Sequence, residues 1–202
     1  MKYLFDPLVN FIGGKIWAPI EFKRITPFIE RGERVLDVGA GGGWTSELIS
    51  RENGADVTLL DIKDFNHTKL PIVLYDGNKM PFEDDSFDVA LLLFVLHHCD
   101  DPKAVLIEAM RVSKRIIILE DTFQSKFDRV VVCANDVITN IPSFFVSKGG
   151  ANFPFQFKRV AEWEALFKEL GMDLEHTKRE KSSIISPEQT LFMLNTSSVK
   201  RG

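Results

Sequence analysis

The sequence predicts an α/β fold in which a mostly parallel sheet is covered by helices on both faces. Two observations lead to this prediction. Short apolar runs alternate along the chain with segments of helical spacing, and parallel strands need such crossovers between them. The first apolar run also ends in glycines and is followed directly by a helical pattern, as in many ligand-binding α/β folds.

The elements can be placed in order along the chain. Strands are predicted where short runs are rich in aliphatic residues, at 34–38, 56–61, 72–75, 88–93 and 115–119. Helices are predicted where apolar residues recur at helical spacing, at 44–53, 103–112, 127–141 and 163–170. Asp101 is the expected N-cap of the second helix, with Pro102 at its first position, and Pro142 is expected to end the third. The runs 172–178 and 189–194 are expected to close the sheet as an antiparallel pair.

Composition narrows the class of protein. The 202 residues are 45% apolar and 27% charged, which fits one globular domain and neither a disordered nor a fibrous chain. The net charge of −4 provides no positive field for nucleic acid or anionic lipid. Cys99 and Cys133 have no metal-ligand or redox spacing, and the apolar run 89–96 is far shorter than the roughly 20 residues of a membrane span. We therefore expect a cytoplasmic protein without a membrane span.

The glycine-rich segment after the first strand is the strongest candidate for a ligand site. Glycines between a strand and a helix let backbone N–H groups approach a ligand closely. The pattern D-x-G-x-G-x-G is matched in full, by Asp37, Gly39, Gly41 and Gly43. The dinucleotide fingerprint G-x-G-x-x-G is not matched, because Trp44 stands where its last glycine belongs. The alternative is a glycine-rich turn without a ligand.

Two acidic residues end the next two strands. Asp61 lies 20 residues after Gly41 (61 − 41), where an acidic side chain can accept hydrogen bonds from both ribose hydroxyls of a nucleotide. Asp76-Gly77 ends the third strand at the same edge, where Asp76 or the neighbouring amides can contact an adenine amino group. The alternative for each acid is an ordinary turn or cap residue.

Five segments follow one another in a familiar order: V-L-D-V-G-A-G-G-G, L-L-D-I, D-G-N-K-M-P-F-E-D-D-S-F-D-V-A, V-L-H-H-C-D-D-P and L-I-E-A-M-R-V. Together they resemble class I S-adenosylmethionine-dependent methyltransferases of the small-molecule, type 11 family. The resemblance is strong over 34–120 and looser over 163–194. It implies a Rossmann-like, seven-stranded sheet whose last strand is antiparallel, S-adenosylmethionine as the cofactor, and methyl transfer to a small molecule.

The resemblance also implies which residues hold the cofactor. The glycine loop would take its methionine end, the end of the second strand its ribose and the end of the third strand its adenine. Residues after the fourth strand would line the methyl-donor pocket. The implied residues are Asp37, Gly39, Ala40, Gly41, Gly43, Asp61, Ile62, Asp76, Gly77, Asn78, Leu93 and Phe94. No metal is expected.

Two departures from the family pattern bear on the fold and the substrate. Ser113-Lys114-Arg115 stands where the family usually has a glycine-containing turn. Positions 93–96 are L-F-V-L rather than the Asn-Pro-Pro-Tyr of enzymes that methylate amino groups of bases, so nucleic acid is not the expected substrate. A catalytically silent S-adenosylmethionine-binding protein and an NAD-dependent oxidoreductase are the alternatives.

No catalytic residue is assigned from the sequence. Displacement at a sulfonium needs no protein nucleophile, and a general base is required only if the acceptor arrives protonated. Candidate bases at the correct edge of the sheet are His97, His98, Glu120 and Asp121. The alternative for the two histidines is a pair that packs and hydrogen-bonds. The acidic turn 83–85 is interpreted as solvated rather than metal-binding.

Phenylalanine is concentrated in one insertion. Seven of the 17 phenylalanines lie within 123–158, namely Phe123, Phe127, Phe144, Phe145, Phe153, Phe155 and Phe157. We interpret this insertion as a lid over a small, partly hydrophobic acceptor, the alternative being packing onto the sheet or a dimer contact. Residues 1–30 are expected to be a helical segment over the active site, 31–196 the methyltransferase domain and 197–202 a polar tail. A monomer or a homodimer is expected.

Overall fold

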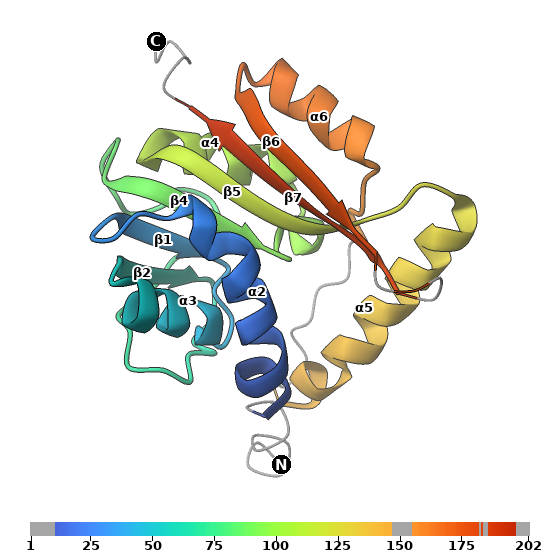
Figure 1. Ribbon diagram of the computed structural model, residues 1–202, viewed down its shortest axis with the longest axis horizontal. Helices are drawn as coiled ribbons and strands as arrows, with labels where there is room; N and C mark the ends of the chain where they lie inside the picture. Colours follow the sequence, from blue (N-terminus) through green and yellow to red (C-terminus); the bar gives the residue numbers. More distant parts are fainter. Residues whose placement is uncertain (1–10, 147–154, 182, 184–185, 197–202) are drawn as a thin grey trace.

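The computed structural model describes residues 11–146, 155–181, 183 and 186–196. Within them, seven strands form one sheet: β1 (Arg34–Val38), β2 (Asp56–Asp61), β3 (Ile72–Leu74), β4 (Phe87–Leu93), β5 (Ser113–Thr122), β6 (Asp173–Glu180) and β7 (Glu188–Asn195). Their order is β3-β2-β1-β4-β5-β7-β6 (Figure 1). Only β7 runs antiparallel to its neighbours, β5 and β6. The predicted fold class is therefore confirmed.

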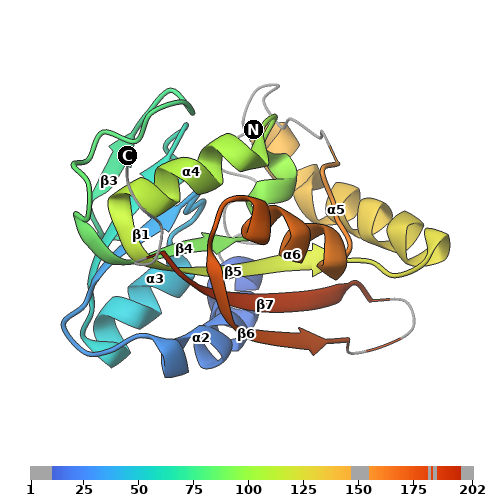
Figure 2. The same ribbon diagram turned by 90° about the horizontal axis from the view of Figure 1, so that it is seen from above.

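Helices cover both faces of this sheet. In chain order they are η1 (Phe11–Trp17), α2 (Ala18–Ile25), η2 (Thr26–Phe28), α3 (Trp44–Leu48), η3 (Ile49–Asn53), η4 (Leu96–His98), α4 (Pro102–Val112), α5 (Lys126–Val146) and α6 (Val160–Glu169). Figure 2 shows α4 and α6 on one side of the strands, with α2 and α3 on the other. Two separate apolar clusters fill the two interfaces.

The strand pattern explains these two clusters. Successive side chains of a strand point to opposite faces, so a strand covered on both sides must be apolar at every position. In β1, Leu36 packs with the α4 and α6 side while Val35 packs with the α2 side. Leu92 and Leu91 of β4 divide in the same way. All four are fully buried, so the carboxyl ends of the central strands are held rigidly.

The helix ends test the sequence predictions. The carboxylate of Asp101 accepts hydrogen bonds from the N–H groups of Lys103 and Ala104, which confirms it as the N-cap of α4. The prediction that Pro142 ends the next helix is wrong, because α5 continues to Val146. Proline removes one N–H donor but has a helical φ, so a helix can contain it at the cost of about one hydrogen bond.

The strand β5 is longer than predicted at both ends. Its residues follow α4 without a turn, and the Ser113 hydroxyl donates to the carbonyl oxygens of Ala109 (2.7 Å) and Arg115 (3.1 Å) at the junction. This arrangement replaces the glycine-containing turn of the family. At the other end β5 continues past Leu119 because it pairs with β7 as far as Thr122. The extension carries Glu120 and Asp121 to the carboxyl edge of the sheet.

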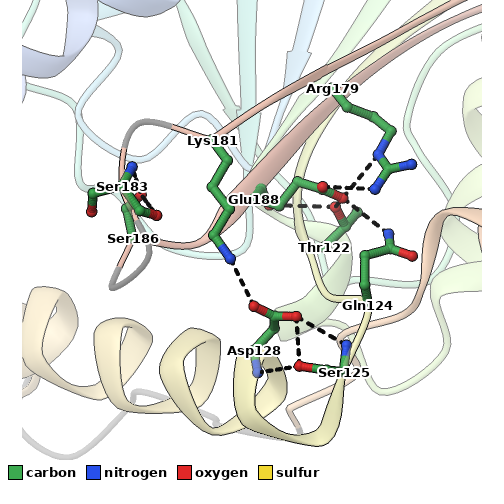
Figure 3. Close-up of polar contacts among 9 residues, drawn as sticks. All are labelled: Thr122, Gln124, Ser125, Asp128, Arg179, Lys181, Ser183, Ser186 and Glu188. Carbon is green, nitrogen blue, oxygen red and sulfur yellow. Dashed lines mark hydrogen bonds and ion pairs between the residues drawn. The ribbon is translucent and has the colours of Figure 1, made fainter.

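The start of α5 is anchored to the hairpin of β6 and β7 (Figure 3). Ser125 and Asp128 form reciprocal hydrogen bonds at the helix start, and Lys181 donates to Asp128 at 2.7 Å. These contacts hold the pKa of Asp128 well below its usual range. In Figures 1 and 2 the helix runs from there toward the amino-terminal helices. None of the helices in the described ranges is long and apolar enough to cross a bilayer.

Candidate functional site

A cavity of about 320 Å³ opens at the carboxyl ends of β1 and β4. Its wall combines the glycine loop, the end of β4 and the first helices of the chain. The lining residues are Trp17, Glu21, Asp37, Gly39, Ala40, Gly41, Gly42, Gly43, Trp44, Thr45, Leu93 and Phe94. The cavity thus brings together seven of the residues predicted from the sequence: Asp37, Gly39, Ala40, Gly41, Gly43, Leu93 and Phe94.

The three glycines of the D-x-G-x-G-x-G pattern all have left-handed backbone conformations. Their φ angles are 70° for Gly39, 53° for Gly41 and 74° for Gly43, a region that residues with a Cβ rarely adopt. Space is also restricted, since a Cβ on Gly39 would lie 2.2 Å from Cγ2 of Val95. Alternating glycines therefore meet a backbone requirement of this loop.

Asp37 is buried beneath the loop. Its carboxylate accepts a hydrogen bond from the Ser46 hydroxyl at 2.7 Å. Burial raises the pKa of Asp37 to about 7; the Ser46 hydrogen bond opposes this rise, and the nearby acids Glu21 and Asp61 add to it. The side chain ties the end of β1 to α3 and places a titratable group at the cavity wall.

Asp61 braces the glycine loop from the end of β2. One carboxylate oxygen accepts the N–H of Gly41 at 2.9 Å and the other accepts the N–H of Lys63 at 3.2 Å. Burial raises the pKa of Asp61, although these hydrogen bonds oppose the rise. Each oxygen can still accept a second hydrogen bond, so the geometry leaves room for hydroxyl donors.

The end of β3 lies next to Asp61 but outside the cavity wall. Tyr75 donates its N–H to the carbonyl oxygen of Asp61, and the Asp76 carboxylate accepts the N–H of Asn78 at 2.9 Å. That hydrogen bond lowers the pKa of Asp76. Gly77 faces Ile62, whose side chain is 58% exposed. The residues implied for adenine thus form an exposed turn beside the cavity.

The end of β4 contributes strained backbone to the cavity. Phe94 has φ of 53° although it is not a glycine, and its N–H donates to the carbonyl oxygen of Leu119 at 2.7 Å. Such a conformation costs on the order of 1–3 kcal/mol and is found preferentially at functional sites. It turns the chain sharply after Leu93.

Several lining residues were not identified from the sequence. Trp17 and Glu21 come from the amino-terminal helices, and the Thr45 hydroxyl donates to Glu21 across the cavity. Burial raises the pKa of Glu21. The ring of Trp44 stacks on His67 at 5.2 Å. No local pattern marks these residues, because a charged or aromatic residue on an amphipathic helix usually faces solvent or core.

The four candidate bases divide between two polar clusters. His97 Nδ1 lies 2.6 Å from Oε2 of the fully buried Glu120, and Asp136 of α5 lies on the other side of its ring. Burial lowers the pKa of His97, but the charges of these two acids outweigh it and raise the pKa to about 10. His98 Nε2 also approaches Asp136, at 3.6 Å. Both histidines thus pack and pair, as the alternative reading of the sequence anticipated.

Asp121 belongs to the second cluster. It accepts a hydrogen bond from the Gln189 amide at 3.1 Å, and Arg24 of α2 donates to the same Gln189 at 2.6 Å. Burial raises the pKa of Asp121 to about 6. Because neighbouring strand residues point to opposite faces, Glu120 and Asp121 serve different clusters.

An apolar groove of about 780 Å³ runs along α5. It is lined by Lys126, Arg129, Val130, Cys133, Ala134, Val137, Ile138 and Phe155. Phe123 and Phe157 of the insertion are buried beneath the helix, whereas Phe127 is 60% exposed. The side chains of Phe144, Phe145 and Phe153 lie outside the described residues.

Comparison with known sequences finds similarity over part of the chain. Residues 36–116 match a family model described as a methyltransferase domain. The demethylmenaquinone methyltransferase of Corynebacterium kroppenstedtii is 35% identical over 103 residues, which are 49% of this chain and 44% of that protein. The chain spans about half the length of the curated relatives it matches.

Solved structures share the fold over nearly the whole chain. A SAM-dependent methyltransferase from Aquifex aeolicus superposes with a TM-score of 0.63 at 18% identity, covering 96% of both chains. A complex between the Trm112 methyltransferase activator of Haloferax volcanii and a methyltransferase gives a TM-score of 0.68 at 15% identity, over 95% of this chain and 94% of that one.

The chain thus shares its fold with solved SAM-dependent methyltransferases, and its glycine loop lies within the segment that matches the methyltransferase-domain model. The match to the methyltransferase-domain model over residues 36–116 confirms the resemblance found in the motifs of that segment.

Proposed function

We propose that the protein transfers a methyl group from S-adenosylmethionine to a small, partly hydrophobic acceptor. The observation that carries this proposal is the left-handed glycine loop, which Asp61 braces and which opens into a cavity beside the end of β4. The loop lies within the segment that matches the methyltransferase family. The proposal extends the family's chemistry to this chain.

The residues around the cavity fit the cofactor. S-adenosylmethionine carries a positive sulfonium and a positive ammonium group. The carboxyl groups of Glu21, Asp37 and Asp61 lie around the loop, where a bound cation would favour their ionised forms. Trp17 and Phe94 add aromatic faces, which attract cations. Asp61 retains capacity to accept ribose hydroxyls, and Asp76 to Asn78 form the exposed turn on the adenine side.

The chain's own part in the reaction is alignment and exclusion of water. The bound cofactor supplies a methyl group on a good leaving group, so no protein nucleophile is required. Leu93 and Phe94 would form the floor next to the acceptor, while Trp17 and Glu21 close the cavity from the amino-terminal side. In this proposal, residues 11–30 cover the active site, as expected of the amino-terminal segment.

The α5 groove supports an apolar class of acceptor. Its wall is apolar except at Lys126 and Arg129 near one end, which suits a flat apolar molecule better than a sugar or a nucleotide. The named relatives act on demethylmenaquinone, an apolar ring compound, which supports the same class. We therefore propose that α5 and Phe155 form the acceptor lid. The cytoplasmic location and the monomeric or dimeric state stay predictions.

Calorimetry tests the cofactor half of the proposal. S-adenosylmethionine and S-adenosylhomocysteine should bind and NAD should not. Asp61→Ala should weaken adenosyl-ligand binding at least about tenfold, because a buried acceptor of two hydroxyl donors is worth about 1.5–3 kcal/mol. Asp64→Ala, at an exposed acid three residues away, is the control and should bind normally. Binding of NAD without either adenosyl ligand would exclude the proposal.

Turnover with a panel of apolar acceptors, including short-chain demethylmenaquinone analogues, tests the other half. Phe155→Ala should lower turnover while S-adenosylhomocysteine binds unchanged. Phe127→Ala, at an exposed residue of α5 that does not line the groove, should alter neither. Equal losses in both variants would contradict the lid assignment. Binding of the cofactor without methylation of any acceptor would favour the catalytically silent alternative.

A further inference from the structure

Three potential metal ligands converge between η4 and α5. His97 and His98 come from η4, and Asp136 comes from the buried side of α5. The Nε2 atoms of the two histidines lie 3.5 Å and 3.6 Å from the same oxygen, Oδ1 of Asp136. His97 is 3% exposed and Asp136 is 5% exposed, whereas the ring of His98 is about one-third exposed.

The two Nε2–Oδ1 distances suit ligands of a shared metal ion better than hydrogen-bond partners. They exceed the 2.7–3.2 Å of a good N–H···O hydrogen bond. They are close to the edge of a tetrahedron of nitrogen and oxygen ligands around zinc, which is about 3.4 Å for bonds of 2.0–2.2 Å. A small shift of the rings would therefore place all three atoms at bonding distance from one ion.

The surroundings of His97 orient the ring for this purpose. Its Nδ1 is 2.6 Å from Glu120 Oε2, while the other oxygen of Glu120 accepts the N–H of Leu96 at 2.7 Å. Phe157 stacks on the ring at 4.4 Å, and the carbonyl oxygen of His97 accepts the N–H of Gln156. A carboxylate on one imidazole nitrogen fixes the orientation of the ring, and here it directs Nε2 of His97 at Asp136.

Charge favours a cation at the same place. Glu120 and Asp136 are both buried and lie on opposite sides of the His97 ring. A divalent ion held between Asp136 and the two imidazoles would lie close to both buried carboxylates and attract them. Two imidazoles and one carboxylate are a ligand set that zinc and related ions accept.

We propose that His97, His98 and Asp136 bind one divalent transition-metal ion, with Glu120 as the residue that positions His97. Three protein ligands leave at least one coordination position for water or a ligand atom, as in open zinc sites. The first ligand of the site, His97, comes three residues after Phe94, so the Cα atoms of Phe94 and His97 are at most about 11 Å apart. If the proposed function holds, the open position lies near the methyl-donor cavity; metal binding itself does not depend on that function.

Metal titration of the chelator-treated, full-length protein tests the site without any cofactor. Co²⁺ should bind with one-to-one stoichiometry and give the strong visible absorption of a four-coordinate complex, and Zn²⁺ should displace it. Asp136→Asn and His98→Ala should each abolish the stoichiometric spectrum. His67→Ala, at an exposed histidine outside the cluster, is the matched control and should bind as the unaltered protein does.

Glu120→Gln separates the positioning role from ligation. It should preserve the spectrum but weaken Co²⁺ binding by roughly 10- to 100-fold, as loss of such an outer partner usually does. Absence of stoichiometric binding in the unaltered protein would overturn the proposal. Unchanged binding in His98→Ala would also overturn it, because this partly exposed ring can be removed without unfolding the core. So would a sulfur charge-transfer band that Cys133→Ser removes.

Discussion

At the scale of single residues, the site depends on backbone conformations that few side chains permit. Gly39 combines two restrictions, a φ of 70° and close contact with Val95. Gly32 has a similar φ of 82°, but a Cβ there would meet no atom within 4 Å. The pair therefore separates the cost of the backbone conformation from the cost of crowding at the cavity.

Gly39→Ala should destabilise the protein by about 3 kcal/mol or more, because the left-handed backbone costs 1–2 kcal/mol and the overlap with Val95 adds to it. It should also weaken S-adenosylhomocysteine binding, since the loop must shift. Gly32→Ala should cost only about 1–2 kcal/mol and leave binding intact. Urea unfolding and calorimetry measure both effects; equal losses in the two variants would show that crowding at Val95 is unimportant.

Residues that act within one short segment can be predicted from the sequence more easily than residues that act through contacts with distant elements. The pattern of alternating glycines is itself the signature of the loop, so Gly39, Gly41 and Gly43 could be identified directly. Glu21 and Asp136 could not, because each meets its partners only after distant elements pack. The one signal for Asp136 is an acid that shares a helix face with the apolar Val132, four residues earlier.

At the scale of elements, the segment L-I-E-A-M-R-V of α4 holds a neighbouring loop in place through Arg111. Arg111 uses all five of its donors, toward Glu108, Asp84 and the carbonyl oxygens of Met80 and Phe82. These contacts fix the loop between β3 and β4 to the helix. The arrangement requires a planar, five-donor group rather than a simple positive charge.

Arg111→Lys should therefore lower the free energy of unfolding by about 1–3 kcal/mol, since an ammonium group can replace at most three of the five hydrogen bonds. Lys103→Ala is the control on the same helix as Arg111. It removes an exposed ion pair between Lys103 of α4 and Glu169 of α6 and should cost less than about 1 kcal/mol. Chemical denaturation of both variants measures the difference. A fully stable Arg111→Lys protein would show that charge alone is sufficient.

Helix α5 shows where the periodicity of a sequence stops being informative. Its spacing predicts a helix, and the helix is present, but the residues that recur at this spacing are largely exposed. Phe127, Val130 and Ile138 face outward, while Val132 and Asp136 face the sheet. Periodicity indicates that one face differs from the other; the packing partner decides which face is buried.

At the scale of the whole molecule, the parallel strands place several buried acids around one edge of the sheet. The order of elements along the chain was predictable from local patterns. The strand order, in which β4 lies next to β1 and β7 lies between β5 and β6, was not predicted, and the resemblance implied only seven strands with the last one antiparallel. Strand order is set by long-range pairing that no short window contains. The topology thus places Glu21 and Asp37 in the wall of one cavity, with Asp61 behind the glycine loop, where it accepts the N–H of Gly41.

The buried acids around the glycine loop should make the stability of the ligand-free protein depend on pH. Asp37 contributes most clearly to this dependence. Burial raises its pKa from the usual 3.8 to about 7, so the native state holds a proton that the unfolded chain releases above about pH 4. Stability from this group is therefore present below pH 4 and is lost as the pH rises to 7. The loss amounts to roughly 2–4 kcal/mol, from a shift of about three pKa units.

Asp37→Asn isolates this contribution, because its amide oxygen can still accept the Ser46 hydroxyl but cannot ionise. The free energy of unfolding, measured in urea from pH 4 to 8, should fall less steeply with pH in the variant than in the unaltered protein. Above pH 7 the variant should equal or exceed the unaltered protein in stability. Parallel curves would mean that Asp37 is ionised throughout this range and that a cation or a bound water network stabilises its charge. In that event, the negative charge of Asp37 would already be compensated before the cofactor binds.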